Sequence, residues 1–142
     1  MDDSSYMDLI MAMENETNSS IMNLTSGQIK ERKNDALQQL QLTREDLKSW
    51  HRKLKHYRLC GEMSDLQYGH YLRWIPLKDP DNLYITNGGI LCDVKVLGDV
   101  IHVIVKNNRS RLFEVKFNEA MIFQKLSDQE RVILGVLDFL AK

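Results

Sequence analysis

The stretch that decides the fold is residues 90–117, ILCDVKVLGDVIHVIVKNNRSRLFEVKF. Apolar and polar residues alternate along much of it, and Gly98-Asp99 and Asn107-Asn108 interrupt the alternation. A period of two is typical of strands that bury one face, and such residue pairs favour tight turns. The stretch therefore predicts three successive antiparallel strands. The residues expected on their core faces are Ile90, Cys92, Val94 and Val96 in the first strand, and Phe113, Val115 and Phe117 in the third.

Two further strands are predicted on either side of this stretch. Tyr71 to Leu77 precedes it and is followed by turn-forming residues at 79–82, while Ala120 to Gln124 follows it. Closing such a small sheet on itself would remove its vulnerable edges. We therefore predict an α+β fold in which residues 69–125 form a five-stranded antiparallel barrel of the SH3-like or Tudor-like kind.

Residues 25–61 are predicted to form a basic helical hairpin. Thr25 and Gln28 fit a capping box at the start of the first helix, and a second helix is expected to begin at Arg44, after Thr43. Apolar residues at helical spacing extend this second helix towards Cys60-Gly61, which would end it. Those residues are Leu47, Trp50, Leu54 and Tyr57.

Residues 126–142 are predicted to form a C-terminal helix packed on the same domain. Ser127 and Glu130 fit a strong capping box. The helix has a wide apolar stripe, made of Val132, Ile133, Val136, Leu137 and Leu140 and extended by Leu134 and Phe139. So much apolar surface implies burial on more than one side, either within the domain or against another chain.

Charge is unevenly distributed although the net charge is only −1. Residues 1–29 contain five acidic residues and no Lys or Arg, whereas residues 30–58 contain nine Lys or Arg and four acidic residues. Five of the seven Met lie within residues 1–24. This composition predicts an acidic, Met-rich flexible arm over residues 1–24, which either docks on a partner or remains an unstructured terminus.

The basic segment provides the first candidate binding surface. A helix over residues 44–58 would display several cations that could neutralise phosphates. They are Lys48, Arg52, Lys53, Lys55 and Arg58, accompanied by His51 and His56. A solvated helix face has the same charge pattern, so this alternative stays open.

The strand that contains Arg73 and Trp74 provides the second candidate surface. If Trp74 or the neighbouring Tyr71 were exposed, their rings would form a stacking or peptide-binding platform beside Arg73. Burial of these aromatic rings in the core is the alternative.

No catalytic, cofactor or metal site is predicted. Asn87-Gly88-Gly89 has the glycines of a phosphate-binding loop but lacks its Lys-Ser/Thr, so it predicts a turn. Cys60 and Cys92 lack the spacing of a zinc site, and they predict reduced, structural thiols. The apolar runs are too short to span a membrane, and the first residues lack the character of a secretory signal. We therefore expect a non-enzymatic protein that is not secreted.

Three segments carry a family resemblance: YLRWIPLK at 71–78, TNGGI at 86–90 and IFQKLSDQE at 122–130. In these segments the chain resembles a group of small uncharacterised proteins of giant, nucleocytoplasmic large DNA viruses. The resemblance covers roughly residues 30–142, and its motifs belong to a fold rather than to a site. It implies a location in the virion, or in the host cytoplasm at the viral factory, and it carries over no catalytic residues.

Two functional hypotheses follow. The first is a structural or interaction protein of a large DNA virus, a minor capsid or core-associated virion component. It would assemble through its helices and its N-terminal arm with viral structural proteins or with itself. The second is a nucleic-acid-associated module whose basic helix at 44–58 binds phosphates.

Overall fold

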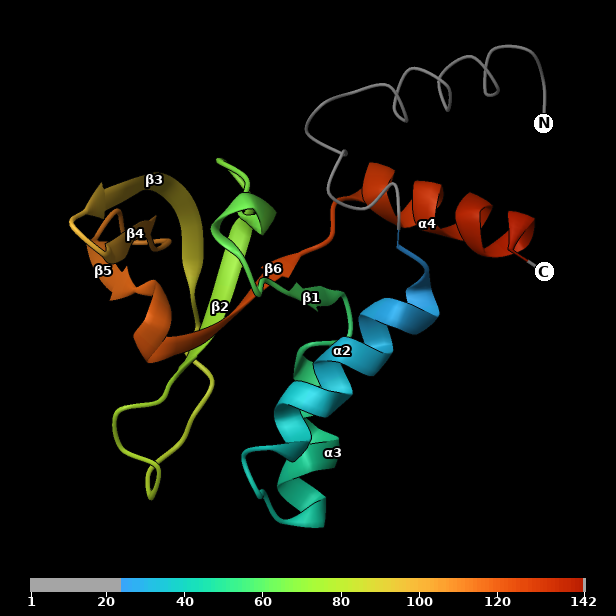
Figure 1. Ribbon diagram of the computed structural model, residues 1–142, viewed down its shortest axis with the longest axis horizontal. Coiled ribbons are helices and arrows are strands. Elements are labelled where there is room, and N and C mark those ends of the chain that lie inside the picture. Colours follow the sequence, from blue (N-terminus) through green and yellow to red (C-terminus); the bar gives the residue numbers. More distant parts are fainter. Residues whose placement is uncertain (1–23, 142) are drawn as a thin grey trace.

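The computed structural model describes residues 24–141, which form one antiparallel sheet and three α-helices (Figure 1). The predicted arm over residues 1–24 lies outside the described residues except for Leu24. The helices are α2 (Ser26–Gln38), α3 (Arg44–Lys53) and α4 (Asp128–Leu140), with short 3-10 turns η2 (Met63–Asp65) and η3 (Phe117–Glu119). The strands are β1 (Tyr57–Leu59), β2 (Tyr71–Pro76), β3 (Gly89–Leu97), β4 (Val100–Lys106), β5 (Leu112–Lys116) and β6 (Ala120–Lys125).

The sheet is open, with the strand order β1-β6-β2-β3-β4-β5. The predicted α+β class is confirmed, as are the helical hairpin that precedes the sheet in the chain and the helix that follows it, but the prediction of a closed five-stranded barrel is wrong. Both edges of β6 are occupied, one by β2 and the other by β1. Strand β5 therefore pairs only with β4, and within residues 24–141 no ladder joins the two ends of the sheet.

Strand β1 is the sixth strand, and it lies where the second helix was predicted to continue. Helix α3 ends at Lys53, and three residues that the pattern assigned to the helical segment, Tyr57–Leu59, pair instead with Phe123–Lys125 of β6. Leu54, directly after the last residue of the helix, is fully buried. Its helical spacing from Trp50 therefore did not mark where the helix ends. The hairpin of α2 and α3 is thus confirmed only up to this point.

A β-bulge in β3 reverses the predicted facing of its first half. The register against β4 shifts between Leu91 and Asp93. Leu91 is therefore the buried residue, whereas Ile90 and Cys92, predicted to face the core, are exposed. Val94, beyond the bulge, packs against the core as predicted. A bulge adds one residue to one strand and thereby changes which side chains share a face.

The ends of the hairpin strands are more exposed than their alternation predicts. Val96 in β3 is 55% exposed and Phe113 in β5 is 41% exposed, although both were expected in the core. Val115 and Phe117 do pack against the core, as predicted. Because the sheet does not close, no further strand covers these two outer positions.

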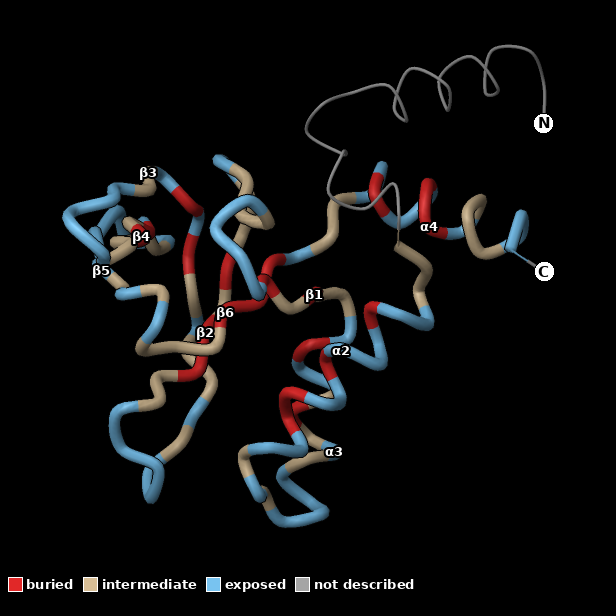
Figure 2. Tube along the Cα trace, viewed as in Figure 1, coloured by how far each residue is buried: buried red, intermediate tan, exposed pale blue. Residues whose placement is uncertain are grey.

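Strands β2 and β6 are buried on both faces and form the centre of the molecule (Figure 2). On one face Leu72, Trp74 and Ile122 pack with residues of β3 and β4. On the other face Ile75 and Phe123 pack beneath α2 and α3 in a cluster with Leu37, Trp50 and Leu54. Alternate residues of the same strands thus belong to two separate apolar cores.

Local capping fixes the starts of the three helices as predicted. Thr25 with Gln28, and Ser127 with Glu130, form complete capping boxes, and the Thr43 side chain caps α3. The start of α2 is also tied to the last turn of α4, because the Ser26 N–H donates to Asp138 Oδ1 at 2.8 Å. A third apolar cluster joins α2 and α4 and contains Ile29, Ile133 and Leu134.

Candidate functional site

The structure divides the cations predicted on helix 44–58. Lys48, Arg52 and Lys53 are exposed on α3, and Lys55 is exposed just after it. Arg58 lies instead in β1 with only 3% of its surface exposed, and its Nη2 donates to the Asp65 carbonyl at 2.6 Å. The predicted single basic helical face is therefore wrong, because the helix ends before two of its members.

Arg73 and Trp74 do not form the predicted exposed platform. Trp74 is 9% exposed and belongs to the core, so the alternative interpretation is the correct one for this residue. Arg73 is half-buried, and its Nε donates to the Thr86 carbonyl at 2.8 Å. Tyr71 is also half-buried, and its hydroxyl donates to the Asn87 carbonyl at 2.6 Å.

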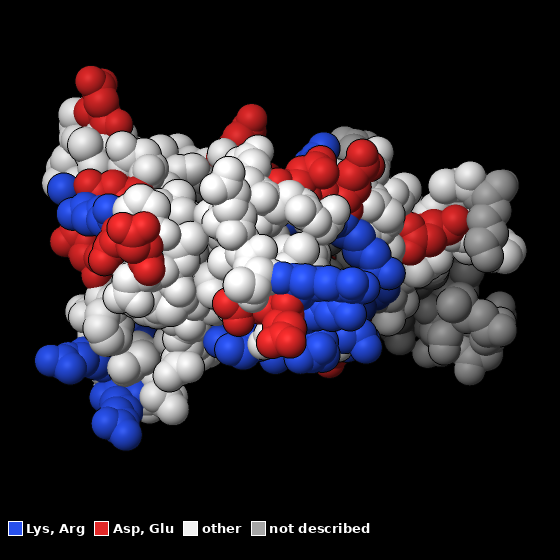
Figure 3. Space-filling view, turned by 90° about the horizontal axis from the view of Figure 1, so that it is seen from below, with Lys and Arg blue, Asp and Glu red and all other residues white. Residues whose placement is uncertain are grey.

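A different group of cations comes together around His56. We call these residues the basic surface: Lys30, Lys55, His56, Lys125 and Arg131. They come from α2, from the segment after α3, from the end of β6 and from the first turns of α4. Most of them line a hollow of about 210 Å³. Figure 3 shows Lys and Arg side chains concentrated over the helical part of the molecule.

The electrostatics of His56 reflect this concentration. The pKa of His56 is held below its usual value, first by loss of hydration and then by the positive charges of Arg131, Lys55, Lys125 and Lys33. No carboxylate is among the charged neighbours that act on it. The ion pairs of residues 24–141 involve Lys78, His70 and His102, and none involves a member of the basic surface. Among the described residues, therefore, no carboxylate pairs with this positive charge.

Lys33 supports the basic surface from beneath. Its side chain is buried at 4% exposure, and its Nζ donates to the carbonyls of Leu54 and Tyr57 at 2.8 and 3.0 Å. Burial, and then the charge of Lys30, lowers its pKa. The ammonium therefore fixes the segment between α3 and β1, which carries Lys55 and His56.

A second hollow adjoins the basic surface on the sheet. It measures about 410 Å³ and is lined by Tyr57, Tyr71, Arg73, Asn87 and Lys125. Tyr57 and Lys125 are direct partners in the β1–β6 ladder. Lys125 thus belongs both to the basic surface and to this second hollow. The row of cations therefore continues from Arg131 on α4, through Lys125, to Arg73 on β2.

A larger groove of about 790 Å³ lies between residues 84–88 and strand β5, where the sheet is open. Its aromatic lining includes Trp74, Tyr84 and Phe113. Gly88 borders it with a φ of +81°, and a Cβ there would lie 1.9 Å from the Leu72 carbonyl oxygen. Glu114, at its rim, is bonded to His102 on β4. The charged residues of its lining are Arg109 and Glu114, so the groove is mixed in character.

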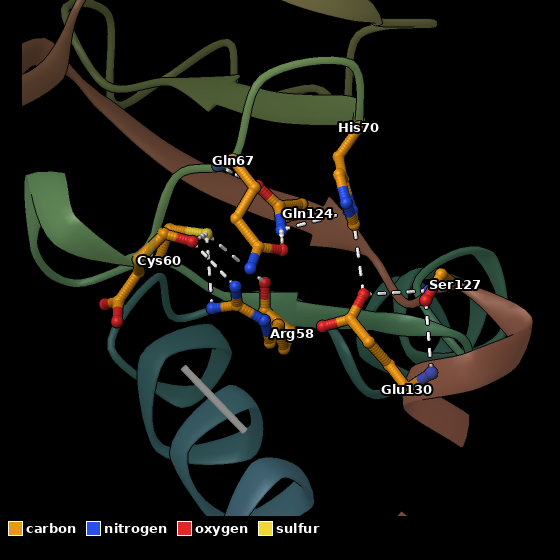
Figure 4. Close-up of polar contacts among 8 residues, drawn as sticks. Arg58, Cys60, Gln67, His70, Gln124, Ser127 and Glu130 are labelled. Atoms are coloured by element: carbon orange, nitrogen blue, oxygen red, sulfur yellow. Dashed lines mark hydrogen bonds and ion pairs between the residues drawn. The ribbon is translucent and has the colours of Figure 1, made fainter. Parts of the chain in front are cut away.

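Buried polar side chains join the sheet to α4 (Figure 4). Gln124, fully buried, accepts from the Gln67 N–H at 2.8 Å and donates to its side chain at 3.0 Å. Glu130, also fully buried, accepts from the Ser127 N–H and lies 3.6 Å from His70 Nδ1. Burial raises the pKa of the Cys60 thiol to about 12, so this thiol is protonated and poorly nucleophilic. The contacts of Glu130 with Ser127 and His70 position the start of α4 against the sheet.

Helix α4 leaves part of its apolar surface uncovered. Ile133 and Leu134 are buried, but Val132, Phe139 and Leu140 are 55%, 72% and 68% exposed. The predicted wide apolar stripe is therefore present, and only one side of it is covered by the domain.

Neither a metal centre nor a membrane span is found in the described part of the chain. There, no group of three or more His, Cys, Asp or Glu side chains could hold a metal ion. No helix among residues 24–141 is long and apolar enough to cross a bilayer. Comparison of the chain with protein-family models, with curated proteins and with solved structures found no match.

Sequence reasoning missed most members of the basic surface. Lys30, Lys125 and Arg131 are separated by up to about a hundred residues in the chain, so a count of charge along it does not group them. Only Lys55 and His56 were predicted on the basic helix at 44–58, whereas Lys30 lay in the wider basic segment at 30–58 but was not singled out as a binding residue. The signal that could have linked them was the pairing of β1 with β6, which the pattern concealed within a helix.

Proposed function

We propose that this protein is a non-enzymatic interaction protein that binds nucleic acid through its basic surface. The observation that carries the proposal is the convergence of cations around His56 from four separate segments, without a carboxylate among them. Phosphate groups would neutralise these charges and release their own condensed counterions, which is the main source of affinity for nucleic acids.

The setting we propose is the virion of a large DNA virus, or the viral factory in the host cytoplasm. This part of the proposal rests on the resemblance of residues 71–78, 86–90 and 122–130. A core-associated virion component would need both a surface for nucleic acid and a surface for neighbouring proteins. The basic surface and the uncovered side of α4 would supply these two.

The test of nucleic-acid binding is its salt dependence. Four permanent cations (Lys30, Lys55, Lys125 and Arg131) should give a slope of log affinity against log salt of about −3. The triple variant Lys55→Gln, Lys125→Gln, Arg131→Gln should reduce that slope to about −1 and weaken binding at low salt. A matched triple variant, Lys95→Gln, Lys106→Gln, Lys116→Gln, removes the same charge from exposed positions on β3, β4 and β5 and should bind normally. Equal losses in both variants would refute the assignment to the basic surface.

The second surface is supported by the exposure of Val132, Phe139 and Leu140 on α4. We propose that this side of the helix packs against a viral structural protein or a second copy of the chain, because apolar patches of this kind mark interfaces. Light scattering after size exclusion tests self-association, and Phe139→Glu with Leu140→Glu should abolish it. A wild-type protein that remains monomeric and has no affinity for virion proteins would contradict this assembly role.

A further inference from the structure

The aromatic rings beside the basic surface indicate which form of nucleic acid it binds. Tyr57 and Tyr71 are half-buried and line the hollow that also contains Arg73 and Lys125. The Tyr71 ring is held by its hydrogen bond to the Asn87 carbonyl, and Tyr57 is held by its packing against the apolar cluster beneath α2 and α3. Two fixed rings therefore lie between cations on the same part of the sheet.

These residues are close enough to influence one another. Burial raises the pKa of Tyr57, while the charge of Arg73 opposes this rise and Tyr71 adds to it. Lys125 is also one of the cations that act on His56. The cations and rings thus form one continuous path, which runs from Arg131 and His56 through Lys125 to Tyr57, Arg73 and Tyr71.

We propose that the ligand of this path is single-stranded nucleic acid, whose phosphates contact the cations and whose bases stack on Tyr57 and Tyr71. This inference deepens the proposed function and rests on it. Bases in a duplex are already stacked on one another, whereas those of a single strand are free to stack on protein rings. A cationic track with interleaved aromatic rings is the arrangement by which proteins bind single strands without sequence preference.

An anionic membrane fits the same region less well. Its contact would require the exposed apolar side chains of α4 to insert while nearby cations bind lipid headgroups. Helix α4 carries Asp128, Glu130 and Asp138 but only one cation, Arg131. Asp138 directly precedes the exposed Phe139 in the last turn of α4. The apolar end of this helix therefore carries negative charge, which anionic headgroups would repel.

The first test compares three probes with the full chain at one salt concentration. They are a labelled oligothymidylate of about 16 nucleotides, a duplex of the same length, and an abasic strand with the same number of phosphates. We expect the oligothymidylate to bind more tightly than both others. Loss of the bases should cost roughly 5- to 100-fold in affinity if one base is stacked, and more if both are.

The outcomes separate this inference from the function on which it rests. Equal or tighter binding of the duplex, or equal binding of the abasic strand, would overturn the single-strand inference but leave nucleic-acid binding intact. No binding of any probe at low salt would overturn both. Tighter binding to vesicles that contain phosphatidylserine than to the oligothymidylate would replace nucleic acid by a membrane as the ligand.

The second test changes the rings. Tyr57→Leu and Tyr71→Leu should each weaken binding of the oligothymidylate by roughly 5- to 100-fold and leave binding of the abasic strand unchanged. Tyr84→Leu is the control, because Tyr84 is 51% exposed and lines the groove beside β5 but not the hollow that contains Tyr57, Arg73 and Lys125. Tyr71→Phe, which keeps the ring, should retain most of the affinity. Equal losses for both strands in the ring variants would overturn the stacking role. If a ring variant fails to fold, the abasic comparison with the wild-type chain tests the same role.

Discussion

The two parts of the sheet differ in how they are covered and in how their charges are paired. Strands β1, β6 and β2 are backed by α2 and α3, and β2 and β6 bury residues on both faces. Strands β3, β4 and β5 contribute to a single core, and several of their apolar residues are exposed. The histidine of the outer part, His102, is paired with Glu114, whereas His56 in the helix-backed part is surrounded by cations. The better-covered part is thus the one that carries the basic surface, which is where we propose that the ligand binds.

The largest expected effect is on stability at the centre of the helix-backed part. Phe123 is fully buried beneath α2 and α3, so Phe123→Ala should lower the free energy of unfolding by about 3–5 kcal/mol. Val115→Ala, at the one half-buried position of the otherwise exposed strand β5, should cost about 1 kcal/mol. Urea unfolding of both variants measures the difference, and similar losses would show that the two parts are covered equally well.

A substitution in the loop that connects the two parts of the sheet is expected to lower the free energy of unfolding nearly as much. Gly88 precedes β3 with a positive φ, and an added Cβ would collide with the Leu72 carbonyl oxygen. Gly88→Ala should therefore cost about 2–3 kcal/mol, because the chain must shift to relieve both the strain and the collision. Gly135→Ala on α4, where a Cβ meets no atom within 4 Å, should instead stabilise the protein by about 0.5–1 kcal/mol. A neutral Gly88→Ala would contradict the close approach of this loop to β2.

The buried ammonium beneath the basic surface gives a third prediction. Lys33→Met would remove the ammonium donor from the Tyr57 carbonyl and one of two donors from the Leu54 carbonyl, which also accepts the Tyr57 N–H, and should cost about 2 kcal/mol. Lys30→Met, on the exposed side of the same helix, should change stability by no more than about 0.5 kcal/mol. Thermal and urea unfolding measure both. Equal effects would mean that Lys33 does not support the segment between α3 and β1.

Much of the fold was predictable from local chemistry. The capping residues Thr25, Thr43 and Ser127 gave the starts of all three described helices, and alternation gave five of the six strands. Tyr57 shows why the sixth strand was missed, since its spacing from Leu54 continues the helical pattern. Its strand forms only because β6 offers a free edge. Such a long-range partner leaves no signal in a short window of sequence.

The candidate site was less predictable for the same reason. The predicted cations Arg52, Lys53 and Arg58 are divided between an exposed helix and a buried strand. The bulge at Leu91 moved Cys92 from the core to the surface, which alternation alone does not foresee. The basic surface is assembled from α2, β6, α4 and the segment after α3, so it depends on tertiary packing. Counting charge along the chain therefore identified only part of it.

The smallest expected effect is the pH dependence of nucleic-acid binding. Burial and the surrounding cations hold the pKa of His56 down, and bound phosphate would raise it by screening those cations. Binding should therefore take up a proton, and affinity should rise as the pH falls towards and below 6.5. The gain at low pH is set by how far the bound phosphate raises this pKa, with a tenfold limit for each unit. His56→Gln should flatten this profile. His51→Gln should not, because the charge neighbour that acts on His51 is Lys33 rather than Lys125 or Arg131.

The most direct test of the central claim is to map amide chemical-shift changes as oligothymidylate is added to the full chain. We expect the changes to concentrate at residues 55–57, 71–73, 125 and 131, and residues 95–116 to change little. Changes confined to β3, β4 and β5, or none at saturating strand, would contradict the claim that the helix-backed part of the sheet is the binding surface.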